Sequence, residues 1–301
     1  SVCAKIDIPY YTVNFEKEYW ERVFRYFLEE YKRGRTPNPD VLCNKEIKFA
    51  AFLDFAQKAG AELLATGHYA RLERRDGMTY LKKGLDDNKD QSYFLCMLSQ
   101  KQIERAVFPV GELQKAEVRR IAEEAGLSVA KKKDSTGICF IGERKFKQFL
   151  QTYLPANPGD MKTLDGKVVG RHDGLMYYTI GQRRGLDIGG SKDGTGERWF
   201  VVKKDMEHNV LYVSQGAESE LLFSRALVMS GVNFISGGEE KTNFGCMAKV
   251  RYRQPDQRAR AEKIGDGAYR VEFAEKQRAV TPGQYCVLYD GAICLGGGVV
   301  D

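Results

Sequence analysis

The sequence predicts an α/β domain, a small connecting domain and a C-terminal β-barrel. Amphipathic helices alternate with a short strand in the first third of the chain, as in layered α/β domains. A segment rich in proline at 153–159 then marks a change in composition, and the last third holds short, turn-bounded strands typical of a small barrel. The expected domains are 1–145, 146–206 and 207–301.

Two helices are expected near the N-terminus. Apolar side chains recur at steps of one, three and four residues over 16–33, which predicts an amphipathic helix. Two closely spaced prolines in 36–40 then force a rigid turn. A second helix is expected over roughly 43–58, with Gly60 as its C-terminal cap.

The next elements continue the helix and strand alternation. A short strand is expected over 62–68, a hairpin and loop over 72–90, and a helix over 115–125. Gly67 and His68 fall at the end of the strand. Ligands of layered α/β domains bind at the carboxyl ends of the strands, so these two residues are candidate ligand contacts.

Composition limits the class of protein. The net charge of +6 is compatible with a polyanionic partner without requiring one. No apolar run approaches the roughly 20 residues of a membrane helix, and no signal-peptide pattern opens the sequence, so we expect a cytoplasmic protein without membrane contact. The seven cysteines lack a Cys-x-x-Cys pair, and we expect neither a disulfide framework nor a metal site.

The strongest chemical signal lies between Pro37 and Asn44. A rigid turn delivers Asp40 and Cys43, three residues apart, to the start of a helix. There the helix dipole favours a thiolate nucleophile, and a neighbouring carboxylate can exchange a proton with a substrate group. The alternative is structural, with Asp40 as a helix cap and Cys43 as a small buried residue.

Other segments allow the same two interpretations. Cys139 follows three lysines, whose charge favours a thiolate, but it also fits a buried strand. Lys89–Gln91 and Gln182–Gly185 are polar or basic turns that either contact nucleic acid or face solvent.

A strand with one apolar and one basic face is expected over 248–253. Its Arg251 and Tyr252 either bind RNA, by phosphate contact and stacking, or form a solvated face. His68 either contacts a ligand or makes structural hydrogen bonds.

Taken together, the segments resemble the tRNA-specific 2-thiouridylases of the MnmA family. Each motif alone is modest, but their order along essentially the whole chain is specific, and it favours the chemical interpretation of Cys43 and Cys139. The matching segments are GRTPNPD and CNKEIKF in 34–49, ATGHY in 65–69, DQSYFL in 90–95, KDSTGICFIG in 133–142, GLMYYTIGQR in 174–183 and TPGQ in 281–284.

The resemblance implies a doubly wound, PP-loop ATP-pyrophosphatase-like first domain and an enzyme that 2-thiolates the wobble uridine of tRNA. ATP, with Mg²⁺, would adenylate the C2 oxygen, and the thiol of Cys139 would carry the incoming sulfur as a persulfide. Cys43 would attack that persulfide, or otherwise help to release the sulfur, and leave a Cys43–Cys139 disulfide. A sulfur-relay protein or a cysteine desulfurase would supply the sulfur.

The resemblance also implies roles for single residues. Asp40 matches a general acid/base, and Asn38, Pro39 and Asp40 match contacts to the target base. Gly67 matches a nucleotide-binding position. The residues that match tRNA contacts are His68, Lys89, Asp90, Gln91, Arg251, Tyr252 and Gln284.

One part of the family pattern does not occur in this sequence. The family's first domain opens with an SGGxDSS loop whose amides wrap a pyrophosphate, and we expect this loop to precede Ser1 in a longer protein. One rival interpretation is a tRNA-binding fragment without catalysis. Another is a thiol redox protein that uses Cys43 and Cys139, which the lack of a Cys-x-x-Cys motif disfavours.

Overall fold

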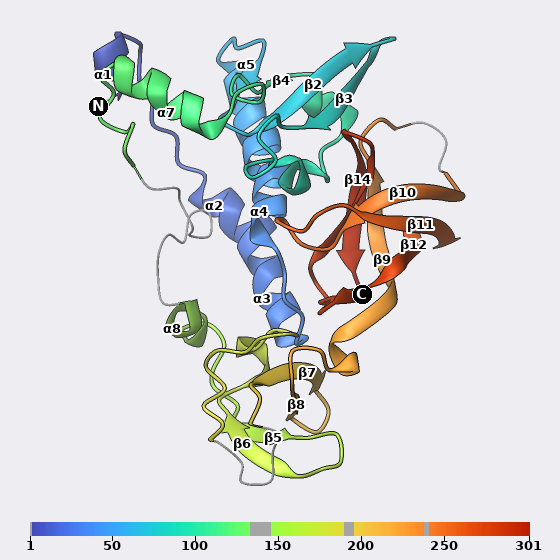
Figure 1. Cartoon of the computed structure of the whole chain (residues 1–301). Coiled ribbons are helices and arrows are strands. Elements are labelled where there is room, and N and C mark those ends of the chain that lie inside the picture. The colour runs from blue at the N-terminus through green and yellow to red at the C-terminus, as the bar shows by residue number, and fades with distance from the viewer. Residues whose placement is uncertain (1, 133–145, 190–195, 238–240) are drawn as a thin grey trace.

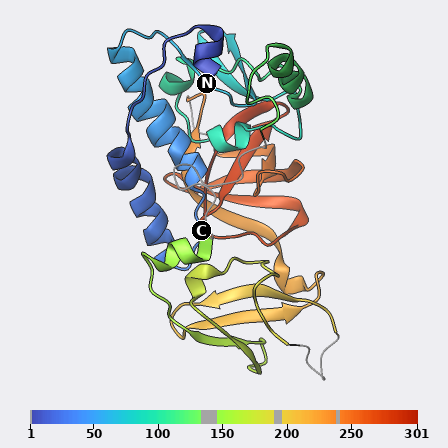
Figure 2. The same cartoon turned by 90° about the vertical axis from the view of Figure 1, so that its left-hand side faces the viewer.

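The computed structural model describes residues 2–132, 146–189, 196–237 and 241–301. A helical N-terminal part, a β-barrel beside it and a smaller sheet below both make up the molecule (Figure 1). Turned by 90°, the long helices stand along one side of the barrel, and the smaller sheet lies at the lower end (Figure 2). The predicted combination of an α/β part, a connecting domain and a C-terminal barrel is confirmed.

Two long helical stretches dominate the N-terminal part. The first is formed by α2 (Glu16–Tyr19), the π-helical η1 (Trp20–Phe24) and α3 (Arg25–Lys32), and the second by α4 (Pro39–Leu42), the π-helical η2 (Cys43–Phe52) and α5 (Leu53–Lys58). The first confirms the helix expected over 16–33. The second begins before residue 43 because Asn38 caps it, with Oδ1 accepting a hydrogen bond from the Asp40 amide at 3.2 Å.

The other elements of the N-terminal part are short. They are α1 (Val2–Ile6), β1 (Leu64–Ala65), η3 (Ser92–Leu95), α6 (Gln100–Ile103), β4 (Ala106–Val107) and α7 (Lys115–Glu124). The strand expected over 62–68 is reduced to β1, because its pairing within the described ranges is with β4, in parallel, over two residues. The helix expected over 115–125 is confirmed as α7. Across the described ranges, no helix is both long and apolar enough to cross a membrane.

The C-terminal part is a closed barrel of antiparallel strands. Its strands are β9 (Phe223–Phe234), β10 (Asn243–Lys249), β11 (Gln257–Gly265), β12 (Ala268–Arg278), β13 (Tyr285–Asp290) and β14 (Ile293–Val300). The order is β13-β10-β11-β12-β9-β14, and the pairing of β13 with β14 closes the ring. The expected hairpin, β2 (Ala70–Arg75) and β3 (Met78–Lys83), extends this sheet from β14. The N-terminal part and the barrel therefore share one sheet.

The strand expected over 248–253 ends early. β10 stops at Lys249, and the chain then turns. The Val250 amide donates to Oε1 of Gln254 at 3.0 Å, so a side chain replaces the next strand partner. Pro255 has no backbone N–H that could donate a hydrogen bond to a neighbouring strand. Arg251 and Tyr252, both within the expected strand, consequently lie on a loop.

The connecting domain is a four-stranded sheet. Its elements are β5 (Gly159–Lys162), β6 (Val168–His172), β7 (Trp199–Asp205) and β8 (Val210–Gln215), with α8 (Phe146–Gln151) before, η4 (Leu175–Tyr177) within and η5 (Glu220–Leu222) after the sheet. The boundary expected between 206 and 207 falls inside this sheet, because β7 and β8 pair antiparallel. Asp205 closes the turn between them by accepting the His208 amide at 3.0 Å, so the sheet continues to Gln215.

Residues 34–36 join the two long helical stretches and contact the connecting domain. Nζ of Lys204, on β7, donates to the Gly34 carbonyl at 2.8 Å. Oγ1 of Thr36 lies 3.3 Å from Oγ1 of Thr179. Burial of Lys204 lowers the pKa of its ammonium to about 8, so a partly desolvated charge holds this contact at neutral pH.

The same residues contact the barrel. The Thr36 amide donates to the Pro282 carbonyl at 2.8 Å, and Nε2 of Gln284 donates to the Thr36 carbonyl at 2.7 Å. Nη2 of Arg35 donates to the Val300 carbonyl, at the end of β14, at 2.6 Å. Residues 34–36 are thus the point where all three domains meet.

The lowered pKa of Lys204 predicts a pH-dependent stability. The folded protein binds fewer protons at Lys204 than the unfolded chain does between pH 8 and 10.5, so this lysine makes stability rise with pH across that window. From pH 8 to 10.5, the unfolding free energy of the unsubstituted protein should therefore rise by at most about 3 kcal/mol more than that of Lys204→Met. Denaturant unfolding at several pH values measures this rise. Lys203→Met, beside it on β7, is the control; equal pH slopes in both variants would contradict the prediction.

Candidate functional site

The turn before the second helical stretch carries three of the expected site residues. Pro37 and Pro39 are buried, and Asn38 lies between them in an extended conformation with φ −109°. Asp40 is half-buried and occupies the first turn of the helix, with its amide held by Asn38. The turn therefore presents the Asn38, Pro39 and Asp40 side chains from a rigid support.

Cys43 follows Asp40 by three residues, which places both on one face of the helix. Its side chain is fully buried, in an apolar cluster with Phe24, Phe27 and Leu150. Cys43 lies just beyond the first helical turn, where the influence of the helix dipole fades, so the dipole favours its thiolate less than the sequence predicts. Cys139, its expected partner, lies outside the described residues.

Gly67 and His68 follow β1 at the carboxyl edge of the β1–β4 pair, as expected. Gly67 is exposed, and apart from its two chain neighbours no described residue comes within 4 Å of the position a Cβ would take. His68 is only 7% exposed, and its Nδ1 lies 2.7 Å from Oγ1 of Thr66. Its ring packs edge-on to Phe108 and tilted to Phe49, with 5.9 Å between ring centroids in each pair.

Burial, and then the positive charge of Lys48, lower the pKa of His68 to about 3. The imidazole is therefore neutral at physiological pH. It can act through hydrogen bonds and packing, but not as a cation toward a phosphate.

The loop after β3 contains two expected tRNA contacts that bond internally. Oδ1 of Asp90, a residue only 5% exposed, accepts the Gly84 amide at 3.1 Å and the Ser92 amide at 3.0 Å. Gln91 donates its amide to the Tyr69 carbonyl at 2.8 Å, and its Oε1 accepts the Tyr69 amide at 3.0 Å. These bonds fix the loop against the residue that follows His68.

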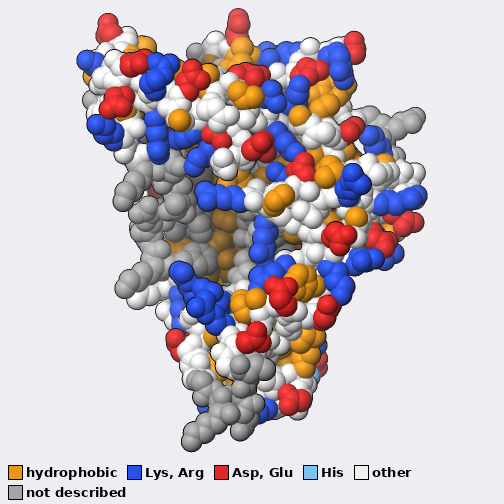
Figure 3. Space-filling model, viewed as in Figure 1, with side chains coloured by type: hydrophobic (Ala, Val, Ile, Leu, Met, Phe, Trp, Pro, Cys, Tyr) orange, Lys and Arg blue, Asp and Glu red, His pale blue; other side chains and the backbone are white. Residues whose placement is uncertain are grey.

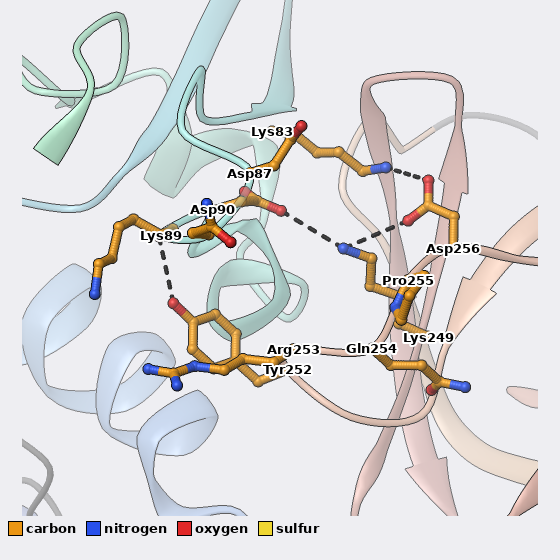
Figure 4. Close-up of a pocket in the computed structure, with 11 residues that line it drawn as sticks. Lys83, Asp87, Lys89, Asp90, Lys249, Tyr252, Arg253, Gln254, Pro255 and Asp256 are labelled. Atoms are coloured by element: carbon orange, nitrogen blue, oxygen red, sulfur yellow. Dashed lines mark hydrogen bonds and ion pairs between the residues drawn. The ribbon is translucent and has the colours of Figure 1, made fainter.

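A pocket of about 580 Å³ opens between this loop and the barrel loop 252–256 (Figure 4). The Tyr252 hydroxyl donates to the Lys89 carbonyl at 3.3 Å, and the Tyr252 ring packs against Phe94 at 4.4 Å between centroids. The side chain of Lys89 points away from the charged residues on the opposite wall. Lys89 and Tyr252, far apart in sequence, thus border one opening.

A charged network forms the other wall of this pocket (Figure 4). Lys83 pairs with Asp256, and Nζ of Lys249 lies 3.4 Å from Oδ1 of Asp256 and 3.9 Å from Oδ2 of Asp90. Both ammonium groups stand over the ring of Tyr289, at 4.6 and 5.3 Å from its centroid. Largely buried charges therefore connect hairpin β2–β3, the loop after β3 and the barrel.

Sequence reasoning missed Lys83 and Asp256. They are 173 residues apart, and no local pattern connects them. Among the described residues, no group of three or more His, Cys, Asp or Glu side chains is arranged to hold a metal ion.

The last two expected contacts lie on the barrel. Arg251 is exposed, and its Nη2 donates to the Ala279 carbonyl at 2.8 Å. The side-chain amide of Gln284 donates its hydrogen bond to the Thr36 carbonyl. Within the expected tRNA set, Lys89, Arg251 and Tyr252 therefore border open surface, whereas His68, Asp90, Gln91 and Gln284 hold loops.

Three family models match successive parts of the chain. A model described as a tRNA methyl transferase HUP domain matches residues 1–143, and one described as a tRNA methyl transferase PRC-barrel domain matches residues 147–215. A model described as an aminomethyltransferase beta-barrel domain matches residues 224–300. The matches cover the same three parts that the fold displays.

Curated relatives match the whole chain. A protein of Geobacillus kaustophilus, tRNA-specific 2-thiouridylase MnmA 2, is 62% identical over 300 residues, which are 100% of this chain and 80% of the relative. The tRNA-specific 2-thiouridylases MnmA of Lysinibacillus sphaericus and Streptococcus thermophilus are 60% and 59% identical, over 100% of this chain and 79% and 81% of their own lengths. The chain belongs to the tRNA-specific 2-thiouridylase (MnmA) family.

Proposed function

We propose that this chain transfers sulfur to the C2 position of the wobble uridine of tRNA, in an ATP-dependent reaction. The observation that carries the proposal is the turn 36–40, which is fixed where the three domains meet and directs Asp40 and Cys43 from one helical face. The names of the relatives, all tRNA-specific 2-thiouridylases, support the same reaction.

The chemistry requires an activated oxygen. The O2 of uracil is a poor leaving group, so its attack on the α-phosphorus of ATP, with loss of pyrophosphate, would turn it into the oxygen of AMP. The outer sulfur of a persulfide on Cys139 then attacks C2, and AMP leaves with the C2–O bond pair. The Cys43 thiolate attacks the Cys139 sulfur, the transferred sulfur keeps the S–S bond pair, and a Cys43–Cys139 disulfide remains for an external thiol to reduce.

The order of the two sulfur steps is open within this proposal. In the other order Cys43 attacks first, and the released hydrosulfide displaces AMP. Both orders end in the same disulfide and need Cys43 close to the base. We assign Asp40 as the group that exchanges a proton with the base, because it is half-buried one helical turn before Cys43.

A target base must leave its stack to reach a site of this kind. Pro39 is buried and Asn38 is fixed by its cap to the helix, so the turn offers a rigid wall for a flipped uracil. We assign Asn38, Pro39 and Asp40 to this contact.

ATP is a co-substrate in this proposal, bound with Mg²⁺. Gly67 fits a nucleotide contact, since its exposed backbone at the carboxyl edge of parallel strands leaves open space on its α-carbon. The described residues contribute this edge, and a phosphate-binding loop of the family type would supply the pyrophosphate contacts.

The tRNA contacts divide into two groups in our proposal. Lys89, Arg251 and Tyr252 meet RNA directly, by phosphate contact and stacking. The members that hold loops in place are His68, Asp90, Gln91 and Gln284. We place the reaction in the bacterial cytoplasm, with a sulfur-relay protein or cysteine desulfurase as donor.

Loss of either thiol should abolish sulfur transfer. Cys43→Ser and Cys139→Ser in the full-length enzyme should each lower 2-thiouridine formation by at least about 10³-fold, because a hydroxyl can neither carry a persulfide nor close the disulfide. Mass spectrometry of nucleosides from the reacted tRNA measures the product. Cys246→Ser, on β10 of the barrel, is the control and should remain active. Full activity in either of the first two variants would refute the assigned roles.

Lys89 should contribute an electrostatic contact to tRNA. Lys89→Ala should weaken tRNA binding and reduce the slope of log K against log salt by about one, the effect of one lost phosphate contact. Titration of labelled tRNA over a salt series measures both quantities. Lys58→Ala, on α5 and paired with Asp54 at 2.7 Å, is the control. An unchanged slope in Lys89→Ala would remove Lys89 from the interface.

The same preparation separates catalysis from binding alone. A binding fragment without catalysis would give salt-sensitive tRNA affinity with no ATP-dependent product. ATP-dependent 2-thiouridine would exclude that alternative.

A further inference from the structure

Two arginines of the barrel converge where the barrel meets the connecting domain. A Cβ on Gly181 would lie 3.7 Å from Nη2 of Arg251 and 3.9 Å from Nη1 of Arg278. Both guanidinium groups therefore lie within 4 Å of a single point. Arg251 comes from the loop after β10, and Arg278 is the last residue of β12.

Contacts to uncharged groups hold both side chains there. Nη2 of Arg251 donates to the Ala279 carbonyl at 2.8 Å, and Nε of Arg278 donates to the Ala217 carbonyl at 3.3 Å. The Arg278 guanidinium also stands 5.0 Å over the ring of Phe200, on β7 of the connecting domain. Among the described residues, the contacts that position both side chains are therefore to carbonyl groups and an aromatic ring.

No carboxylate in the described parts of the chain forms an ion pair with Arg251 or Arg278, whereas Arg270 on the same strand as Arg278 pairs with Glu272. Desolvation, and then the charge of Arg278, lower the pKa of Arg251, although its side chain remains in contact with solvent. Two like charges held together without a counter-charge disfavour each other, and an anion between them would remove that cost.

The connecting domain adds basic residues to this point. Gly181 has φ +81°, and any side chain on it would collide with Ala279, since a Cβ there would lie 2.6 Å from the Ala279 Cβ. The basic turn Gln182–Gly185 begins at this contact, with Arg183 and Arg184 exposed. On the face shown in Figure 3, Lys and Arg side chains gather along the border between the connecting domain and the rest of the molecule.

We propose that Arg251 and Arg278 together bind one phosphodiester of the tRNA backbone at the border of the barrel and the connecting domain. Arginine suits this role because its planar fork donates two parallel hydrogen bonds to phosphate oxygens. The proposal rests on the proposed function, and it adds Arg278 and a shared phosphate to the contacts assigned there. It also gives the basic turn Gln182–Gly185 a place beside the same RNA strand.

The position of this phosphate site connects RNA binding to the reacting turn. Arg278 precedes Ala279, whose carbonyl accepts both Arg251 and, at 2.9 Å, the Thr281 hydroxyl. The chain then continues directly to Pro282 and Gln284, which hold Thr36. One short segment therefore binds the backbone of the RNA at one end and supports the turn for the flipped base at the other.

The test measures tRNA binding by Arg278→Gln, Arg251→Gln and the double variant over a salt series. Glutamine removes the charge but keeps part of the aliphatic stem and an amide donor. Thermal melting checks that each variant is folded. Each single variant should bind about tenfold more weakly, with a salt slope lower by about one. Because both residues would hold the same phosphate, the double variant should lose clearly less than the product of the two single losses.

Arg270→Gln, from the same strand, is the matched control and should bind like the unsubstituted protein. If Arg278→Gln and Arg270→Gln give the same affinity and slope, the phosphate site is refuted while the proposed function stands. If the losses multiply in the double variant, the two residues hold separate groups and the shared phosphate is refuted. If Arg278→Gln does not fold, Arg278→Lys replaces it. A retained salt slope with weaker tRNA affinity would support a two-point contact of the Arg278 guanidinium to phosphate. An unchanged affinity would refute that contact. Failure of the unsubstituted protein to bind tRNA at any salt would refute the proposed function together with this site.

Discussion

The rest of the site depends on the hydrogen bonds between Thr36 and the barrel segment Pro282–Gln284. The amide and the carbonyl of Thr36 are both used, at 2.8 and 2.7 Å, so the backbone just before Asn38 is fixed in position and direction. The helix that begins at Pro39 then sets Asp40 and Cys43 on one face. The turn that carries the proposed catalytic residues is thereby positioned by a domain distant in sequence.

A network of buried charges also holds segments that are distant in sequence in fixed positions. Ion pairs among Lys83, Lys249, Asp90 and Asp256 connect the hairpin, the loop before Ser92 and the barrel. The two lysine ammonium groups also stand over the ring of Tyr289. Removal of one member would leave a desolvated charge behind, which costs far more than the loss of a surface ion pair. The loops that border this pocket are consequently fixed relative to one another.

Local patterns predicted the helices, the barrel and the turn 36–40, because periodicity and proline chemistry act over a few residues. They failed where a single side chain ends a strand or closes a turn. The strand over 248–253 ended at Lys249 because a Gln254 side chain replaced a strand neighbour, and the boundary at 206 fell inside a hairpin closed by Asp205. Lys89 and Asp90 are adjacent and line the same pocket, yet the Lys89 side chain points away from the charged wall, whereas the Asp90 carboxylate is a buried acceptor.

The most direct test of this account measures hydrogen exchange at the amides of 35–44 in Gly283→Ala and Gly291→Ala. Both glycines have positive φ, +91° and +54°, so alanine strains each backbone. At Gly283 the new Cβ would meet the turn, 2.9 Å from the Thr36 nitrogen. At Gly291, apart from the chain neighbours, no described residue lies within 4 Å of the new Cβ. We expect faster exchange over 35–44 in Gly283→Ala alone. Equal protection in the two variants would contradict the claim that the barrel holds the turn 36–40 in place.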